Sequence, residues 1–412
     1  MAPESDRVLN THEGVKTGHA AQLGRLVGEL GMRQRDLKSL AVASCVLALA
    51  GALPSGAAGE KPTAKSTRNS GSAELVVGIS TNDIFTDNLD KAEAAAQQIE
   101  DLGATAVRFF YTLNKGTAWQ NYTQETCNAF QAAYDHHLQP IVAFRGYDED
   151  GPGYVPSSPT EMRQFNTTAA SIIWTVASNK DAQHPGGCVP QQKNFIFEGI
   201  NEINADPPFN RYLDANTPVQ ALIMDSRLSR TLKKEAARPE IQATVSFGES
   251  LSVGSHDVLG FLKAQAQAET DLNIQNPYDF IDVHPYPKNP TDDPSITMAN
   301  LDKPINDLLN SSFPGTKLVW GEIGVETVDP PASEASAYSP PVSHAIGVSE
   351  STQAKYITNF LKTAATEGSP WVTLFGLQDD GNGSTPSSGE YYVSGNPKSS
   401  EPAIKYQIGK YK

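Results

Sequence analysis

Few cysteines and few basic residues occur in this sequence. It has 3 Cys among 412 residues, none in a Cys-x-x-Cys pair, so neither a zinc knuckle nor a thiol redox motif is present. Its 32 Lys and Arg are outnumbered by 47 Asp and Glu, which gives a formal net charge of −15 at pH 7. Because no basic block interrupts this balance, we expect no nucleic-acid partner and favour a neutral, sugar-like one.

The motifs of several cofactor and nucleophile chemistries are also missing. The turn after the first strand-like run reads Gly-Ile-Ser-Thr-Asn-Asp rather than Gly-x-Gly-x-x-Gly, and the chain has no Walker loop and no Gly-x-Ser-x-Gly elbow. The first strand-like run also lacks the His-x-His pair that a metal-dependent hydrolase on a barrel would carry. We therefore expect no cofactor and no metal.

The longest apolar run, Ser39–Leu53, is about 15 residues, shorter than the roughly 20 needed to cross a bilayer. Basic residues precede it and the small residues Gly56-Ala57-Ala58 follow it, which is the order of a secretory signal. We expect residues 1–58 to be this signal, with an uncleaved anchor as the alternative, and residues 59–73 to be a flexible linker. The mature protein is then expected to be secreted or periplasmic (cell envelope), and free of the membrane.

Two cysteines, Cys127 and Cys188, remain after removal of the predicted signal. An oxidising compartment would allow them to pair. The sequence leaves this open because it does not give the distance between their Cα atoms.

Short β-branched runs alternate with amphipathic runs from residue 74 to residue 412. The predicted strands are Leu75–Ser80, Ala104–Tyr111, Pro140–Arg145, Asn194–Glu202, Ile241–Phe247, Phe280–His284, Lys317–Glu322 and Trp371–Leu377. The predicted helices are Asp90–Leu102, Thr123–His137, Thr160–Ser178, Pro218–Ala236, Val258–Ala268, Ile296–Leu309, Ser351–Glu367 and Glu401–Lys410. This alternation predicts an α/β fold, a single-domain (β/α)₈ TIM barrel, with its active site at the carboxyl ends of the strands.

Two glutamates stand at such strand ends. The fourth predicted strand leads into Asn201-Glu202, and the seventh ends in Gly-Glu322. Carboxylates on strands four and seven face each other across a narrow barrel mouth, where they can flank one bond. Cleavage of an acetal needs this arrangement, because one carboxyl protonates the leaving oxygen while the other captures the anomeric carbon.

The segment Phe-Glu-Gly-Ile-Asn201-Glu202-Ile-Asn resembles the Trp-Glu-x-x-Asn-Glu-Pro-Asn pattern of the clan A glycoside hydrolases, particularly families 5 and 39. Ile203 stands where those families usually have Pro, and Phe197 where they usually have Trp. The resemblance implies a retaining enzyme on a (β/α)₈ barrel, with Glu202 as acid/base, Glu322 as nucleophile and Asn201 contacting the substrate.

The same resemblance suggests roles for further strand-end residues. Arg108 would hydrogen-bond the nucleophile, although a strand-end salt bridge to Glu198 is the alternative, and Glu198 itself is expected to be structural. The segment Asp282-Val-His284-Pro-Tyr286 would bring His284 and Tyr286 to the sugar and the nucleophile. Where the clan often has Trp on its last strand, this chain has Gly376, so Phe375, Gln378 or Trp119 would supply contacts to the sugar.

These observations predict a retaining glycoside hydrolase, expected to be a monomer, that acts on a β-linked oligo- or polysaccharide. The carboxyls of Glu202 and Glu322 should lie about 5–5.5 Å apart, and Glu202 should have a raised pKa. Glu249 and Glu326 are weaker candidates for the two roles. A (β/α)₈ barrel that binds glycans without cleaving them is the alternative function.

Overall fold

The computed structural model describes residues 75–114, 122–148, 151–156, 158–179, 186–205, 217–253, 257–289, 291–327, 331, 333–334, 347–379 and 388–411. The chain divides into two compact units, and the fold described below belongs to the larger, which comprises residues 71–157 and 161–412. The predicted signal, the linker and Trp119 lie outside the described residues. Among the residues that are described, no helix is long and apolar enough to cross a membrane.

The strands form one nine-stranded sheet in the order β2-β1-β9-β8-β7-β6-β5-β3-β4, and a pairing between β2 and β3 closes it. Only the short β4 pairs antiparallel, so eight parallel strands make the barrel. The prediction of a (β/α)₈ barrel is confirmed. The strands are β1 Val76–Ser80, β2 Ala106–Asn114, β3 Gln139–Asp148, β4 Gly151–Pro152, β5 Asn194–Ile200, β6 Thr244–Ser252, β7 Phe280–His284, β8 Lys317–Ile323 and β9 Trp371–Phe375.

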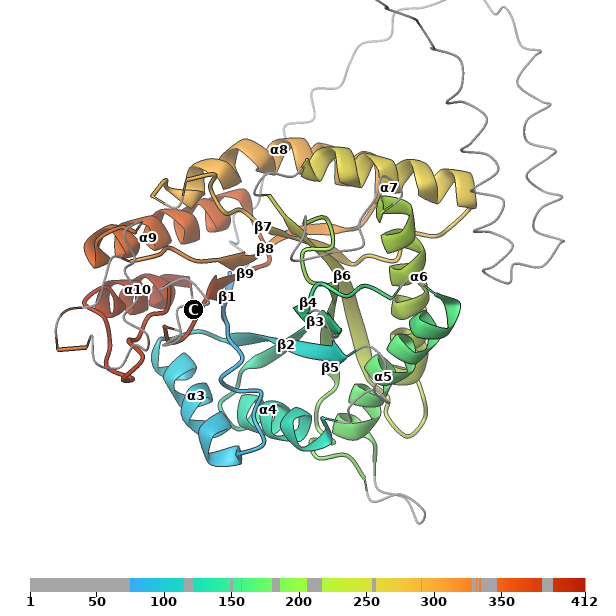
Figure 1. The fold of residues 1–412 in the computed structure, drawn as a ribbon, viewed down its shortest axis with the longest axis horizontal. Helices are drawn as coiled ribbons and strands as arrows, with labels where there is room; N and C mark the ends of the chain where they lie inside the picture. Colours follow the sequence, from blue (N-terminus) through green and yellow to red (C-terminus); the bar gives the residue numbers. More distant parts are fainter. Residues whose placement is uncertain are drawn as a thin grey trace, which may run out of the picture. The chain divides into compact units, whose positions relative to one another are not determined.

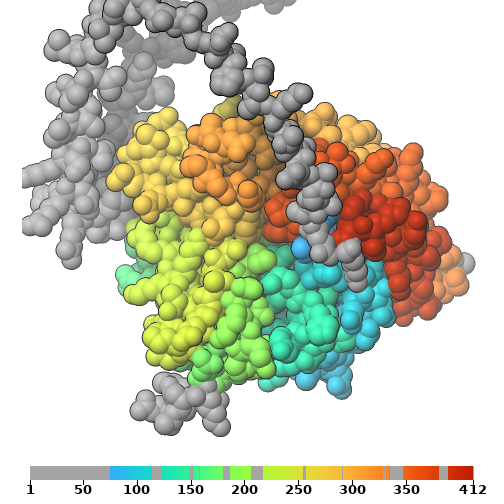
Figure 2. Space-filling model, turned by 180° about the vertical axis from the view of Figure 1, so that it is seen from behind, coloured from blue at the N-terminus to red at the C-terminus, as the bar shows by residue number. Residues whose placement is uncertain are grey.

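The helices of the described part lie outside the strands (Figure 1) and each overlaps one that the sequence predicts. They are α3 Leu89–Asp101, α4 Thr123–Asp135, α5 Pro159–Ala177, α6 Thr217–Ala236, α7 Val258–Leu272, α8 Pro294–Ser312, α9 Glu350–Glu367 and α10 Glu401–Ile408. In Figure 2 the sequence colours follow one another round the barrel, so that the red end meets the blue start. This agrees with the pairing of β1 and β9.

Local sequence signals fix several helix ends. Asn88, Asp257 and Ser349 accept hydrogen bonds from backbone N–H groups in the first turns of α3, α7 and α9. At the other end of α9, Gly368 takes the left-handed conformation (φ 77°) that stops a helix. These caps place the helix starts after the loops at the barrel mouth.

The inside of the barrel changes character along its length. The layer near the amino-terminal ends of the strands is apolar and contains Ala106, Ile141, Phe280, Val319 and Trp371. A separate, larger apolar cluster fills the space between the strands and the helices. Toward the carboxyl ends of the strands the inward residues become polar, and that end holds the site.

Most strands end one to five residues away from the prediction, and two of these differences move candidate site residues. The fifth predicted strand ended at Phe247, but β6 continues to Ser252, so Glu249 and Ser250 are strand residues. The fourth predicted strand included Glu202, but β5 ends at Ile200 and Glu202 lies in the following turn. The prediction stopped early because the end of β6 contains glycine and polar residues. Gly248 is needed in this strand, since a Cβ there would lie 2.2 Å from the Phe280 ring.

Cys127 of α4 and Cys188, which precedes β5, form a disulfide. The pairing left open by the sequence is therefore present in the structure. It links two segments that are 61 residues apart in the chain.

Candidate active site

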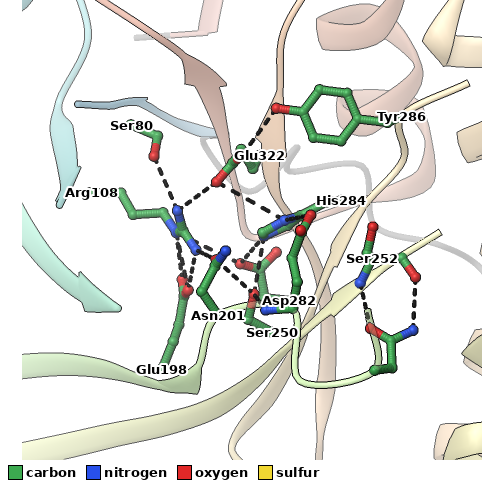
Figure 3. Close-up of polar contacts among 12 residues, drawn as sticks. Ser80, Arg108, Glu198, Asn201, Ser250, Ser252, Asp282, His284, Tyr286 and Glu322 are labelled. Atoms are coloured by element: carbon green, nitrogen blue, oxygen red, sulfur yellow. Dashed lines mark hydrogen bonds and ion pairs between the residues drawn. The ribbon is translucent and has the colours of Figure 1, made fainter. Parts of the chain in front are cut away.

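Glu322 lies near the end of β8 with its carboxylate at the barrel mouth, 6% exposed. Figure 3 shows it between two donors. The Arg108 Nη1 donates to Glu322 Oε2 at 2.8 Å, and the Tyr286 hydroxyl donates to Oε1 at 3.0 Å. Both oxygens of Glu322 are thus held by hydrogen-bond donors, and these stabilise its charged form.

Arg108 of β2 is fully buried and contacts two carboxylates at once. It donates to Glu198 Oε2 from Nη2 at 2.7 Å and from Nε at 3.0 Å. Its remaining donors reach Glu322, the Ser80 hydroxyl at 3.0 Å and the Asn201 side-chain oxygen at 2.6 Å. Arg108 therefore makes both of the predicted contacts: it hydrogen-bonds Glu322 and forms the salt bridge to Glu198.

Glu198 is the buried structural partner that the sequence suggests. Burial raises the pKa of Glu198 to about 8, although Arg108 acts against this rise. Asp282 of β7, also fully buried, lies 4.0 Å from the Arg108 Nε and adds to the negative charge. A Cβ at Gly321 would lie 1.7 Å from the Asp282 carboxylate, so only glycine leaves room for that side chain.

Glu202 lies in the turn after β5, in the left-handed region (φ 50°) that residues other than glycine seldom adopt. Its backbone N–H donates to the Ser250 hydroxyl at 3.3 Å, and its Oε1 lies 2.9 Å from the Nδ1 of His284. Non-glycine residues in this conformation concentrate at functional sites. The turn directs the Glu202 carboxylate toward His284 and Glu322.

His284 ends β7 and is fully buried among acceptors. Its Nδ1 faces Glu202, while its Nε2 lies 3.2 Å from the Ser250 hydroxyl and 3.3 Å from Asp282. Burial lowers the pKa of His284, but the surrounding carboxylates, Asp282 first, raise it to about 10. Both ring nitrogens therefore carry protons at neutral pH.

The pKa of Glu202 differs from the sequence-based expectation. Burial raises it, but hydrogen bonds from His284 and Ser252 and the charge of His284 outweigh burial, so the pKa lies below its ordinary value. The expectation of a raised pKa is wrong for this arrangement because the sequence does not show that a protonated imidazole lies against the carboxylate.

Glu202, His284 and Glu322 also form the group that could hold a metal ion, with ligand atoms within 4.8 Å of one another. The His284 Nδ1 lies 4.0 Å from Glu322 Oε2, whereas ligands of a tetrahedral zinc site lie about 3.4 Å apart. That nitrogen is protonated and bonded to Glu202. The geometry favours hydrogen bonding over coordination.

The other predicted site residues divide into two groups. Phe375 pairs in register with Ser80, whose hydroxyl faces Arg108, so the half-buried ring faces the barrel mouth. Gln378 does not reach the site, because its side chain donates to Gln98 of α3 at 3.3 Å. Gln378 therefore has a side-chain partner outside the group of contacts that joins Arg108, His284 and Glu322.

Glu249 points away from the mouth. It lies on the outer face of β6, fully buried, where Gln265 of α7 donates to it at 2.7 Å. Glu326 follows β8, and its backbone carbonyl accepts a hydrogen bond from the Val348 N–H at 2.9 Å. Sequence reasoning missed the roles of Ser80, Ser250 and Asp282. The available signal was the alternation of side chains along a strand, which directs these three residues into the barrel.

No protein-family profile and no curated protein sequence matches this chain. Solved structures do match its fold. An exo-β-1,4-mannosidase from Opitutaceae bacterium strain TAV5 is 14% identical with a TM-score of 0.51, over 82% of this chain and 59% of that one. The chain thus spans less than two thirds of that mannosidase.

Two further structures are similar. An endo-1,4-β-mannanase from Rhizomucor miehei is 10% identical with a TM-score of 0.53, over 82% of this chain and 94% of that one. A glucosidase from Croceicoccus marinus is 11% identical with a TM-score of 0.53, over 82% and 68% of the two chains. At these identities the similarity shows a shared fold, and it agrees with the resemblance to clan A.

Proposed function

We propose that this chain is a retaining glycoside hydrolase of β-linked sugars, with Glu202 as acid/base and Glu322 as nucleophile. The observation that carries the proposal is the approach of their carboxylate oxygens to within 4.8 Å. Retaining enzymes hold their two carboxyls about 5–5.5 Å apart, whereas inverting enzymes need roughly 6.5–9.5 Å to admit a water. The short separation supports attack by Glu322 itself.

The surroundings of Glu322 suit a nucleophile. Arg108 and Tyr286 each hold one of its oxygens, which fixes the direction of the carboxylate. In the first step Glu322 bonds to the anomeric carbon as Glu202 gives a proton to the leaving oxygen. In the second step Glu202 removes a proton from water, which displaces Glu322 and restores both groups.

The proton for the first step belongs to a pair. Because the pKa of Glu202 is lowered and that of His284 is raised to about 10, the pair carries one proton over a wide pH range. Transfer along the 2.9 Å contact between Nδ1 and Oε1 supplies it to Glu202. The pH dependence of activity then belongs to the pair rather than to either residue.

The hydrogen bonds of Asn201 support a role in contacting the sugar. Its side-chain oxygen accepts from Arg108 at 2.6 Å and from Ser250 at 3.3 Å, so its amide NH₂ is left to donate toward the mouth. Hydrogen bonds from such donors to the sugar hydroxyl beside the reacting carbon strengthen as the transition state forms. Phe375 offers an apolar ring face on the other side of the mouth.

The names of the similar mannosidase and mannanase make β-1,4-mannan the first substrate to test.

Replacing each of the two glutamates in turn with alanine separates their roles. Glu322→Ala should fail on every substrate, and azide or formate entering the vacated space should give a product of inverted configuration. Glu202→Ala should still react with a dinitrophenyl glycoside and show a burst, because that leaving group needs no proton. Azide should then release a product of retained configuration.

A matched control and the opposing outcomes are available. Glu240→Ala removes an exposed carboxylate and should leave activity unchanged. If the two site variants exchange these behaviours, the roles are reversed. If wild-type protein binds β-glycans without releasing product, the glycan-binding alternative holds instead.

The signal segment, monomeric state and export also belong to this proposal. The disulfide between Cys127 and Cys188 supports export, because such bonds persist in oxidising compartments. Expression of the full chain in a secreting host, followed by amino-terminal sequencing and light scattering, tests cleavage near residue 58 and the monomer. Retention of residues 1–58 on a membrane-bound product would favour the uncleaved anchor.

A further inference from the structure

A second feature of the barrel mouth is an open hollow of about 520 Å³. It lies where the loop after β1, the ends of β2 and β3 and the start of α4 meet, which is the same end of the barrel as Glu322. We define the aromatic hollow by its lining residues Phe85, Asp87, Thr112, Tyr122, Glu125 and Tyr147.

We propose that the aromatic hollow is a distal subsite for a neutral pyranose unit of the same sugar chain whose bond lies at Glu322. The inference rests on the proposed function, which it extends to the length and charge of the substrate. The chemistry of the lining supports it. Aromatic side chains offer flat apolar faces to the C–H faces of a sugar ring, while carboxylates and a hydroxyl accept or exchange hydrogen bonds with its hydroxyls.

A continuous row of side chains joins the hollow to the catalytic carboxylates. The Arg108 guanidinium, which binds Glu322, lies 4.9 Å from the centre of the Phe110 ring. The Arg145 guanidinium follows, 5.6 Å from Phe110 and 5.4 Å from the ring of Tyr147 in the hollow. Arg108 is buried beneath Glu322, so a ligand that reaches the hollow from Glu322 would pass over the exposed part of this row.

The distance sets the kind of ligand. Arg108 and Thr112 are four positions apart on β2, which is a rise of about 13 Å. One sugar ring does not cover that span, so a ligand that reaches both Glu322 and the hollow is an oligosaccharide. An enzyme built this way favours chains over small glycosides.

The charge of the hollow sets its selectivity. Asp87 is exposed and Glu125 half-buried, and both line the hollow. Two carboxylates repel a uronate and accept from the hydroxyls of a neutral sugar. Aromatic rings beside carboxylates also suit a quaternary ammonium group, and the test distinguishes that ligand from a sugar.

The first measurement compares substrates of different length. We use the β-1,4-linked hexasaccharides of mannose, glucose and xylose beside the matching aryl monoglycosides. Tyr147→Ala should reduce kcat/KM for the hydrolysed hexasaccharide about tenfold more than for the aryl glycoside, mainly through KM. Tyr406→Ala is the matched control, since it removes an exposed tyrosine of α10 outside the hollow and should change neither. An equal loss on both substrates overturns the proposal.

The second measurement is independent of hydrolysis. In the Glu322→Gln background, calorimetry should show that Tyr147→Ala weakens binding of a neutral hexasaccharide, and that a β-1,4-linked oligomannuronate of the same length binds more weakly than the neutral mannose chain. Asp87→Asn combined with Glu125→Gln should reduce that discrimination. Failure of hydrolysis with this binding pattern intact refutes the proposed function but not the subsite. Absence of binding by all three hexasaccharides, or tighter binding of choline than of any of them, refutes the subsite.

Discussion

Replacement of Arg108 by methionine tests the buried charge cluster most directly. Methionine fills similar space but carries no charge and donates no hydrogen bond. The change would leave Glu198 fully buried without its cation, would leave Asp282 with His284 alone, and would free one oxygen of Glu322. The variant therefore isolates the energetic role of one guanidinium among three carboxylates.

The expected loss follows from burial. Breaking a fully buried ion pair by removing one partner costs about 3–5 kcal/mol, because the charge that remains has lost its compensation. Glu198 already has a pKa raised to about 8 with Arg108 present, and without it the pKa should rise further. A raised carboxyl pKa favours the folded state at acidic pH and loses that advantage as the pH rises. Both folded proteins hold this proton at lower pH, so the difference between variant and wild type should widen only above the wild-type Glu198 pKa of about 8.

Urea denaturation followed by circular dichroism gives the free energy of unfolding at each pH. The double variant Arg108→Met with Glu198→Gln removes the orphaned charge as well, and should recover part of the loss. A double-mutant cycle then gives the coupling between the two side chains. A loss under about 1 kcal/mol, or a double variant as unstable as the sum of the two single ones, would refute this account of the cluster.

Three further changes have defined outcomes. His284→Asn leaves Glu202 to hold the catalytic proton alone, so the alkaline limb of kcat/KM should move down from near the His284 pKa of about 10; an unmoved limb contradicts the shared proton. His136 bonds two glutamates of α3, which raise its pKa despite burial, so His136→Gln should lower the free energy of unfolding more at pH 5 than at pH 8 in paired urea titrations. Replacing both Cys127 and Cys188 with serine should lower the free energy of unfolding by up to about 4 kcal/mol, and reduction of the wild-type disulfide should have the same effect. Equal stability of the oxidised and reduced proteins would contradict this.

The architecture could be predicted because local patterns determine it. Each of the eight parallel strands and its following helix produced a run of the right period, and Phe280–His284 matches its prediction at both ends. The prediction failed at the end of β6, where Gly248 and Glu249 look like loop residues. Their burial depends on Phe280 and on Gln265, which lie on other elements of the fold.

The site was predictable only in part, for the same reason. Glu202 and Glu322 stand at strand ends and could be selected from the chain itself, whereas Gln378 was selected by proximity in sequence and points to α3. The partners of His284 lie in the turn after β5, on β6 and on β7, and they come close to it only once the barrel closes. Sequence reasoning therefore identified the carboxylates but missed the imidazole contact that lowers the pKa of Glu202.

The charges inside the barrel explain why a proton is held there at all. Four carboxyl groups, those of Glu198, Glu202, Asp282 and Glu322, share two basic groups, Arg108 and His284. Even with both basic groups charged, the cluster has excess negative charge in a space that water does not screen, so protons bind tightly. Burial and neighbouring carboxylates raise the pKa of Glu198, and carboxylates raise that of His284 against its burial. The excess of acid therefore keeps a proton beside Glu202, where the first step of the proposed reaction uses it.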